Sequence, residues 1–157
     1  MILAIKTDTE PSEIYLLDST GEIVRKRIWS AGRSLAKDLL SKIQTLAGED
    51  FAKIDGVIVY EGPGSFTGLR IGITVANAFA YAKGIRVIGK TGEGWIQAGI
   101  KDFASPGQDF RSTKISTEET SENGVIFREK SELENRAKLE IVRPNYGGEA
   151  HITTPKK

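Results

Sequence analysis

The chain has 157 residues, 39% of them hydrophobic and 27% charged, which is enough apolar material for one folded domain with a small appendage. Its 22 basic and 21 acidic side chains leave a formal net charge of +1, which disfavours strong non-specific nucleic-acid binding by this chain alone. The absence of cysteine excludes disulfides, thiol catalysis and thiolate metal sites, and a single histidine excludes a histidine-rich metal centre within one chain.

The first third of the chain predicts three strands and a helix. Strand character appears at residues 2–6, 13–17 and 22–29, and residues 18–21 (Asp-Ser-Thr-Gly) have the composition of a hairpin turn. The next apolar residues recur at helical spacing between a candidate N-cap, Ser34, and a candidate stop, Gly48. These residues are Leu35, Leu39, Leu40, Ile43 and Leu46.

The middle third predicts an α/β layer. We expect a buried strand at 54–60, a helix at 65–83, a short strand at 85–88 and a helix at 93–100. The order of three strands, helix, strand, helix and strand predicts a mixed sheet with helices on one or both faces.

The composition becomes polar near residue 101, which predicts a division into a domain of residues 1–100 and a reduced appendage of residues 101–157. Within the appendage we expect a strand at 125–128, a helix at 131–138 and a last strand at 139–142. The N-terminus has the pattern of a first strand rather than a signal peptide, and no apolar stretch is long enough to span a bilayer. A soluble, cytoplasmic protein is therefore expected.

Two glycine-rich segments have the spacing of nucleotide-binding motifs. Gly62, Gly64 and Gly68 lie between a strand and a helix, but the spacing is GxGxxxG, Pro63 removes an amide donor, and no acidic ribose ligand follows about 20 residues later. A tight structural turn is the preferred interpretation, with an anion site as the alternative. Residues 84–91 (Gly-Ile-Arg-Val-Ile-Gly-Lys-Thr) satisfy the P-loop pattern, but their apolar β-branched composition indicates a strand.

The helix at 65–83 is apolar on nearly all sides, which is typical of a helix buried on more than one face. The sheet can cover only one face of this helix. Gly72, Ala76 and Ala80 recur at intervals of four and predict close approach of a second helix, either from this chain or from another subunit.

The run Gly-Pro-Gly-Ser-Phe-Thr-Gly-Leu-Arg-Ile-Gly at 62–72 resembles the signature of the TsaB (YeaZ-like) family. Residues 2–9 resemble the family's opening strand and turn, residues 31–40 its first helix and 84–89 the following strand. Residues 143–156 resemble its closing Pro-x-Tyr and lysine tail, so the resemblance covers about residues 1–100 and the C-terminus, and the chain is similar to a short form.

This resemblance implies an actin-like, Hsp70-type (ASKHA) subdomain with a reduced second subdomain. It implies a non-catalytic partner, a pseudo-enzyme, in the threonylcarbamoylation of adenosine 37 of tRNA. The implied partners are a TsaD-like paralogue, which would carry the ATP or ADP and the metal, and a TsaE-like ATPase. The chain would have no cofactor of its own and would reach tRNA only through the complex.

The expected partner interface lies on the first and the long helix, with Arg70 and the turn at 62–68 at its edge. Its residues are Leu35, Leu39, Gly62, Pro63, Ser65, Phe66, Thr67, Leu69, Arg70, Gly72, Ile73, Ala76 and Ala80. A homodimer through the same surface is an alternative. A nucleotide hydrolase using Gly84–Thr91 and a glycoprotease-like peptidase are the rival functions.

Two positions depart from the family pattern. Lys6 stands where the family has an aspartate that serves nucleotide-bound metal in actin-like folds, which argues against independent ATP hydrolysis. Residues 35–37 read Leu-Ala-Lys where the family's first helix usually reads His-Ser-Glu.

Overall fold

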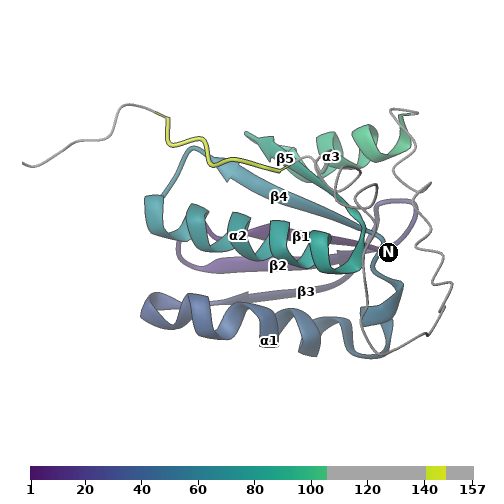
Figure 1. The fold of residues 1–157 in the computed structure, drawn as a ribbon, viewed down its shortest axis with the longest axis horizontal. Coiled ribbons are helices and arrows are strands. Elements are labelled where there is room, and N and C mark those ends of the chain that lie inside the picture. Colours follow the sequence, from purple (N-terminus) through teal and green to yellow (C-terminus); the bar gives the residue numbers. More distant parts are fainter. Residues whose placement is uncertain (106–140, 148–157) are drawn as a thin grey trace, which may run out of the picture.

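The computed structural model describes residues 1–105 and 141–147 of the chain. They form a five-stranded sheet in the order β3-β2-β1-β4-β5 (Figure 1). The strands are β1 (Ile2–Lys6), β2 (Ser12–Leu17), β3 (Ile23–Trp29), β4 (Gly56–Gly62) and β5 (Arg86–Thr91). The helices are α1 (Leu35–Ala47), α2 (Phe66–Lys83) and α3 (Trp95–Ala104), with the short 3-10 turns η1 (Gly32–Ser34) and η2 (Gly48–Lys53) flanking α1.

The sheet is mixed, as the sequence predicts. β1 is antiparallel to β2 and parallel to β4, β2 is antiparallel to β3, and β4 is parallel to β5. Each parallel connection passes through a helix, because parallel neighbours need a long crossover. The first strand of the chain therefore becomes the central strand of the sheet.

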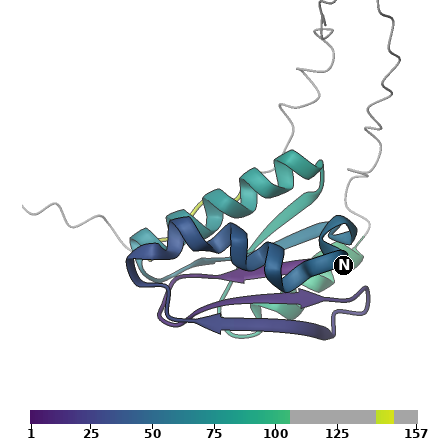
Figure 2. The ribbon, with the colours of Figure 1, turned by 90° about the horizontal axis from the view of Figure 1, so that it is seen from below.

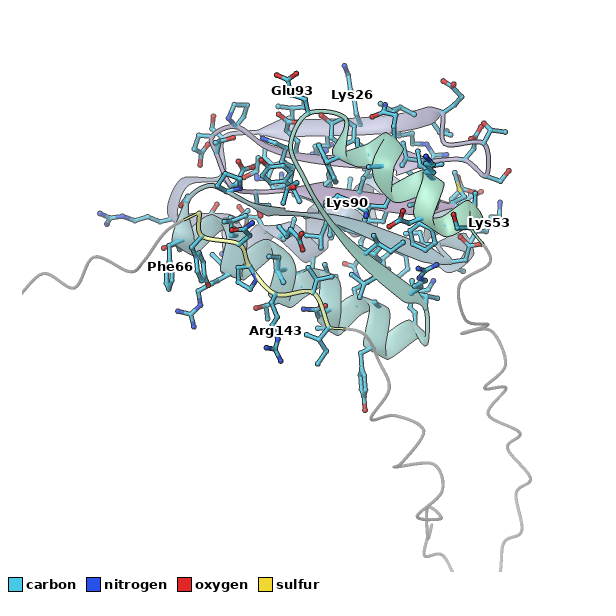
Figure 3. The ribbon with its side chains drawn as sticks, turned by 90° about the horizontal axis from the view of Figure 1, so that it is seen from above. Lys26, Lys53, Phe66, Lys90, Glu93 and Arg143 are labelled. Atoms are coloured by element: carbon cyan, nitrogen blue, oxygen red, sulfur yellow. The ribbon has the colours of Figure 1, made fainter. Side chains whose placement is uncertain are left out.

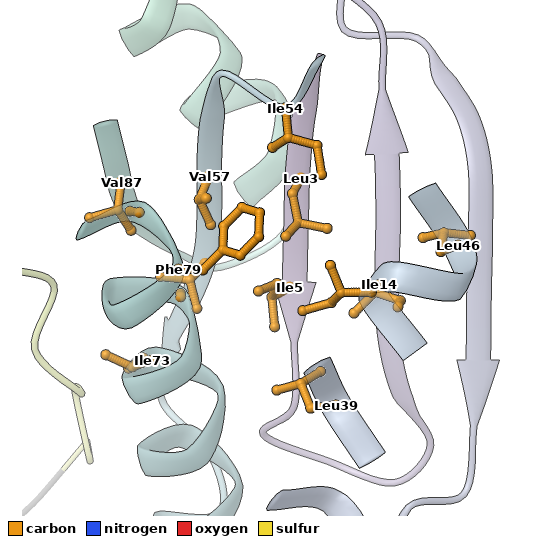
Figure 4. Packing of buried hydrophobic residues seen from close by; sticks show 14 of the residues in the cluster. Leu3, Ile5, Ile14, Leu39, Leu46, Ile54, Val57, Ile73, Phe79 and Val87 are labelled. Atoms are coloured by element: carbon orange, nitrogen blue, oxygen red, sulfur yellow. The ribbon is translucent and has the colours of Figure 1, made fainter. Parts of the chain in front are cut away.

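Helices cover both faces of the sheet. α1 and α2 lie side by side on one face, and α3 lies on the other (Figures 1 and 2). The face under α1 and α2 holds the larger core, in which Ile5, Ile14 and Leu39 lie together and Phe79 lies near Val57 (Figure 4). A smaller core under α3 contains Ala4, Ile58 and Trp95. The continuous apolar run of β1 is explained by its burial on both faces.

The hairpin predicted at residues 18–21 is confirmed. One carboxylate oxygen of Asp18 accepts hydrogen bonds from the amides of Thr20 and Glu22, at 2.8 and 3.0 Å. The hydrogen bond from the Thr20 hydroxyl is the largest cause that lowers the pKa of Asp18, and the backbone amide bonds lower it further. The short side chain thus fixes the turn that joins β2 to β3.

The ends of the first helix are where the sequence places them, although one capping bond differs. Ser34 precedes α1, but its hydroxyl donates to the carbonyl of Ala31 at 2.9 Å instead of capping the helix, because the turn η1 runs directly into α1. Gly48, at φ 54°, ends the helix and donates its amide to Gln44.

Three element boundaries differ by a few residues from the prediction. β4 occupies Gly56–Gly62 because η2 and its cap extend to Ile54 and because the pairing with β5 continues to Gly62. β5 extends to Thr91 for the same reason. α3 begins at Trp95, after Gly94 at φ 73°, and continues to Ala104.

The division placed after residue 100 falls inside α3. The strand at 125–128, the helix at 131–138 and the reduced second subdomain lie outside the described residues. Of the strand at 139–142, only Ile141 and Val142 are described, and they are not assigned to a strand. No helix within residues 1–105 is long and apolar enough to cross a bilayer.

Candidate functional site

The glycine-rich turn packs against the loop that follows β1. The Thr7 hydroxyl donates to the carbonyl of Gly68 at 2.8 Å, and the amide of Ser65 donates to the carbonyl of Asp8 at 2.9 Å. A Cβ atom at Gly68 would overlap the carbonyl oxygen of Thr7, and one at Gly64 would overlap Asp8. The glycines therefore allow two backbone segments to approach closely. This agrees with the tight structural turn and leaves the dinucleotide interpretation without support.

Lys6 and Asp8 form an ion pair beside this turn. Lys6 Nζ lies 3.0 Å from Asp8 Oδ1, and the Asp8 side chain is only 5% exposed. Asp8 Oδ1 accepts no hydrogen bond from the described residues, so its contact with Lys6 is an attraction between opposite charges and not a hydrogen bond. The ammonium also lies 5.2 Å from the centre of the Tyr60 ring. The position that the family resemblance associates with an aspartate thus holds a cation with its own counter-charge.

The P-loop-like segment is not a loop. Gly84 ends α2 in the left-handed conformation, at φ 63°, and residues Arg86–Thr91 form β5. Lys90 Nζ lies 2.5 Å from Asp102 Oδ2 in α3. The structure contradicts a phosphate-binding loop at 84–91, because the amides that would hold the phosphate belong to a strand.

The predicted partner face of α2 is turned toward the chain's own sheet. Ala76 is fully buried, and Gly72 packs against Thr7. Leu35 and Leu39 of α1 are buried in the same core. The prediction was wrong about which side of α2 faces outward, because the small residues face the interior of this chain, where Gly72 meets Thr7 in the loop after β1. The predicted interface residues buried in the chain itself are Leu35, Leu39, Gly62, Leu69, Gly72, Ile73, Ala76 and Ala80.

The remaining predicted residues lie together on the surface. They are Pro63, Ser65, Phe66, Thr67 and Arg70, all at or near the start of α2. Phe66 is 51% exposed, and the Arg70 guanidinium lies 5.1 Å from the centre of its ring. On the neighbouring helix Leu40 is 45% exposed, although its helical spacing had placed it with the core residues.

Residues 141–147 lie along α2 and were not predicted to do so. The side-chain amide of Asn77 donates to the carbonyl of Val142 at 2.9 Å and accepts from the amide of Val142 at 3.1 Å. Tyr146 stacks on Phe66 with ring centres 4.5 Å apart, and the amide of Asn145 donates to the carbonyl of Glu61 at 2.6 Å. The polar Asn77, between the apolar residues Ala76 and Ala78, was the one indication of this contact in the sequence.

The acidic residues near β1 do not form a pair. Both Glu10 carboxylate oxygens accept backbone amides, from Ala31 at 3.2 Å and from Gly32 at 2.6 Å, whereas Asp8 faces Lys6. No group of three potential metal ligands is present within residues 1–105 and 141–147, and the single histidine, His151, lies outside these ranges.

Comparison with known proteins shows a shared fold and a partial match to one family model. The model of the family described as TsaD, tRNA N6-adenosine threonylcarbamoyltransferase, matches residues 30–100. The solved structure of YeaZ from Pseudomonas aeruginosa matches with 30% identity and a TM-score of 0.52, covering 57% of this chain and 43% of that one. The chain is therefore similar to YeaZ in fold and, over part of its length, in sequence.

A second solved structure is described as an uncharacterized protein with similarity to peptidase YEAZ from Pseudomonas aeruginosa. It matches with 30% identity and a TM-score of 0.52, over 57% of this chain and 42% of that one. No curated protein sequence matches. The mixed sheet with flanking helices is the actin-like fold of YeaZ, so the fold class predicted from the sequence is confirmed. This YeaZ-like chain spans less than half the length of either structure.

Proposed function

We propose that this YeaZ-like chain is a non-catalytic partner of a TsaD-like transferase in the formation of N6-threonylcarbamoyladenosine at adenosine 37 of tRNA. The support is the match to the TsaD family model, the likeness to YeaZ and the composition of the chain, which has one histidine and no cysteine. In this proposal ATP or ADP and the metal bind to the partner subunit. A TsaE-like ATPase joins the complex, and tRNA is contacted only through it.

The observation that carries the proposal is the outer surface of the α1–α2 layer. Leu40 on α1 and Phe66 on α2 are each about half exposed, at 45% and 51%. Arg70 lies over the Phe66 ring, and arginine and aromatic side chains are enriched in protein interfaces. Large apolar groups exposed on adjacent helices indicate a surface that is buried in an assembly.

The proposed interface differs in composition from the one predicted by sequence. It consists of outward-facing residues of α1 and α2, and the buried stripe of α2 has no part in it. Its residues are Leu40, Phe66, Thr67, Arg70 and Thr74.

Binding to the TsaD-like paralogue from the same genome tests this surface. We expect Leu40→Lys to weaken the complex at least about tenfold, since a charge would be buried without a counter-charge. The matched control is Ile28→Lys, because Ile28 is equally exposed, at 48%, and lies opposite Glu13 on β3. Arg25 of β3 contacts the end of α1 and therefore lies on the face of the sheet that α1 covers. Because side chains alternate along a strand, Ile28 lies on the opposite face of the sheet, away from the proposed interface.

Size-exclusion chromatography with light scattering and titration calorimetry supply the readouts, with and without ATP. Binding by the wild type and Ile28→Lys but not by Leu40→Lys, at equal melting temperatures, is the expected result. Absence of a mixed complex in every nucleotide condition overturns the proposal. So does a homodimer that Leu40→Lys dissociates while no mixed complex is formed.

A further inference from the structure

The free edge of β5 differs in character from the α1–α2 surface. β5 is the last strand of the sheet, and among residues 1–105 and 141–147 only β4 pairs with it. A strand in this position has backbone amides and carbonyls pointing away from the sheet, and another extended segment can pair with them.

A cleft follows this edge. It has a volume of about 480 Å³ and is lined by β5 from Arg86 to Lys90, by Asp102 of α3 and by Ile141 and Val142. At about 3.3 Å per residue, five residues of strand make a groove about 16 Å long, which fits a short extended peptide. The floor of the cleft is thus a strand, and its two walls come from α3 and from residues 141–142.

One wall is cationic. The Arg86 guanidinium donates to the carbonyl of Asp102 at 3.2 Å and lies 5.6 Å from the centre of the Phe103 ring. Lys90 pairs with the Asp102 carboxylate at 2.5 Å. Arg86 and Lys90 are four residues apart on one strand and therefore share a face. Two cations against one carboxylate leave this wall with a net positive charge.

The other wall is apolar. Ile141 is 69% exposed, and Val142 packs against Gly89 of β5. The Glu61 carboxylate also lies over Gly89, so an apolar side chain of the ligand is favoured over an acidic one at this wall. The side chains of an added strand alternate between the two faces of the sheet. One set would meet the cationic wall and the other set would meet Ile141 and Val142.

We propose that the β5 edge binds an extended segment of a partner protein in which acidic and apolar side chains alternate. Main-chain hydrogen bonds to β5 supply the pairing, and the two walls supply the specificity. A nucleic-acid strand fits less well, because Asp102 would lie near its phosphates and its backbone offers no amide donors. The β5 edge is a different surface from the exposed side of α1 and α2, although residues 141–147 border both, since Tyr146 stacks on Phe66 and Val142 lines the cleft.

Fluorescence anisotropy with the full chain alone tests this site independently of the proposed function. The probe is a labelled hexapeptide, Glu-Val-Glu-Val-Glu-Val, compared with Lys-Val-Lys-Val-Lys-Val and with an acidic peptide N-methylated at alternate amides. We expect only the first to bind. Lys90→Glu should weaken it at least about tenfold and should bind the basic peptide instead.

The matched control is Lys26→Glu, which makes the same charge change on β3, at the opposite edge of the sheet from Lys90 (Figure 3). This variant should bind the acidic peptide like the wild type. Lys90→Gln provides a milder change if Lys90→Glu lowers the melting temperature. Equal binding of acidic and basic peptides, or full binding of the methylated peptide, contradicts the proposal. So does an absence of binding, in which case Arg86 and Lys90 serve to keep other strands away from the edge.

Discussion

At Gly68 the first loop of the chain comes so close to α2 that a side chain has no room. The carbonyl oxygen of Thr7 occupies the place that a Cβ atom would need, and the Thr7 hydroxyl is bonded to the Gly68 carbonyl at 2.8 Å. The obstacle is backbone, so a small side-chain movement cannot relieve it. This single residue therefore determines how closely the β1–β2 loop and the start of α2 can pack.

Replacing Gly68 with alanine should lower the free energy of unfolding by about 1–3 kcal/mol, the usual cost of overpacking. In a helix without such a contact the same change would raise stability by up to about 1 kcal/mol, so the sign of the effect is diagnostic. Urea denaturation gives the measurement, with Thr74→Ala on the exposed side of α2 as control. A higher urea midpoint for Gly68→Ala would rule out this packing role.

The glycine-rich segment also shows what sequence can indicate at this scale. Its position between a strand and a helix was predictable from the sequence. The sequence also argued against nucleotide binding there, because Pro63 has no amide hydrogen to donate. The neighbour that the glycines accommodate was not predictable, because Thr7 and Gly68 are 61 positions apart. Lys6 was recognised as a departure from the family pattern, whereas its pairing with Asp8 became evident only in the structure.

For both α1 and α2 the sequence prediction assigned buried residues to the partner interface, and α2 is the clearer case. Its composition is apolar nearly all round, so periodicity predicted a helix without indicating which side faces the sheet. Leu69, Ile73, Ala76 and Ala80 fall on the buried arc, and Phe66, Arg70 and Thr74 fall on the exposed arc. Small residues are compatible with close approach to either a sheet or a second helix, which is why spacing alone did not distinguish the two.

The contact between β5 and α3 has a measurable electrostatic signature. The hydrogen bond from Lys90 is the largest cause that lowers the pKa of Asp102 below its ordinary value of 3.8, with smaller contributions from the charges of Arg86 and Lys101. Because the pKa is depressed in the folded state, this contribution to stability is present above pH 3.8 and is lost as the pH falls through the folded-state pKa.

Lys90→Met should therefore raise the pKa of Asp102 toward 3.8, as followed by carbon NMR of the labelled carboxyl group. Lys101→Met, which removes a charge with a smaller effect on the same carboxylate, should raise it less. An unchanged Asp102 pKa in Lys90→Met would mean that the two side chains do not pair in solution.

For the molecule as a whole, the order of elements and the mixed sheet were predictable from strand and helix patterns. The order of the strands within the sheet and the position of α3 on the face opposite α1 and α2 were not, since local patterns do not specify which elements become neighbours. The docking of residues 141–147 likewise depends on contacts such as Asn77 with Val142, which are 65 positions apart.

Tryptophan substitution on α2 separates the interior of the whole molecule from its partner surface. Ala76 is 0% exposed, so Ala76→Trp should cost about 3 kcal/mol by overpacking, a large fraction of a typical domain stability, and should lower the melting temperature clearly. Thr74→Trp, two residues away on the exposed arc, should melt like the wild type and bind the TsaD-like partner more weakly.

Circular dichroism melting and co-elution are the two measurements. A normally folded Ala76→Trp protein would mean that α2 is not packed on the sheet as described. Normal partner binding by Thr74→Trp would place the interface elsewhere.

The central position of β1 has a consequence for the order in which this fold can assemble on the ribosome. β1 is synthesised before the other four strands and pairs early with β2 across a short loop, but its other neighbour begins 54 positions later, where Ile2 faces Gly56. Until β4 emerges, the nascent chain can form only the antiparallel β1–β2–β3 unit and α1, with one edge of β1 open. The parallel half must then add to that edge through contacts distant in sequence, which form slowly, so this open edge is the feature that a chaperone would have most reason to cover.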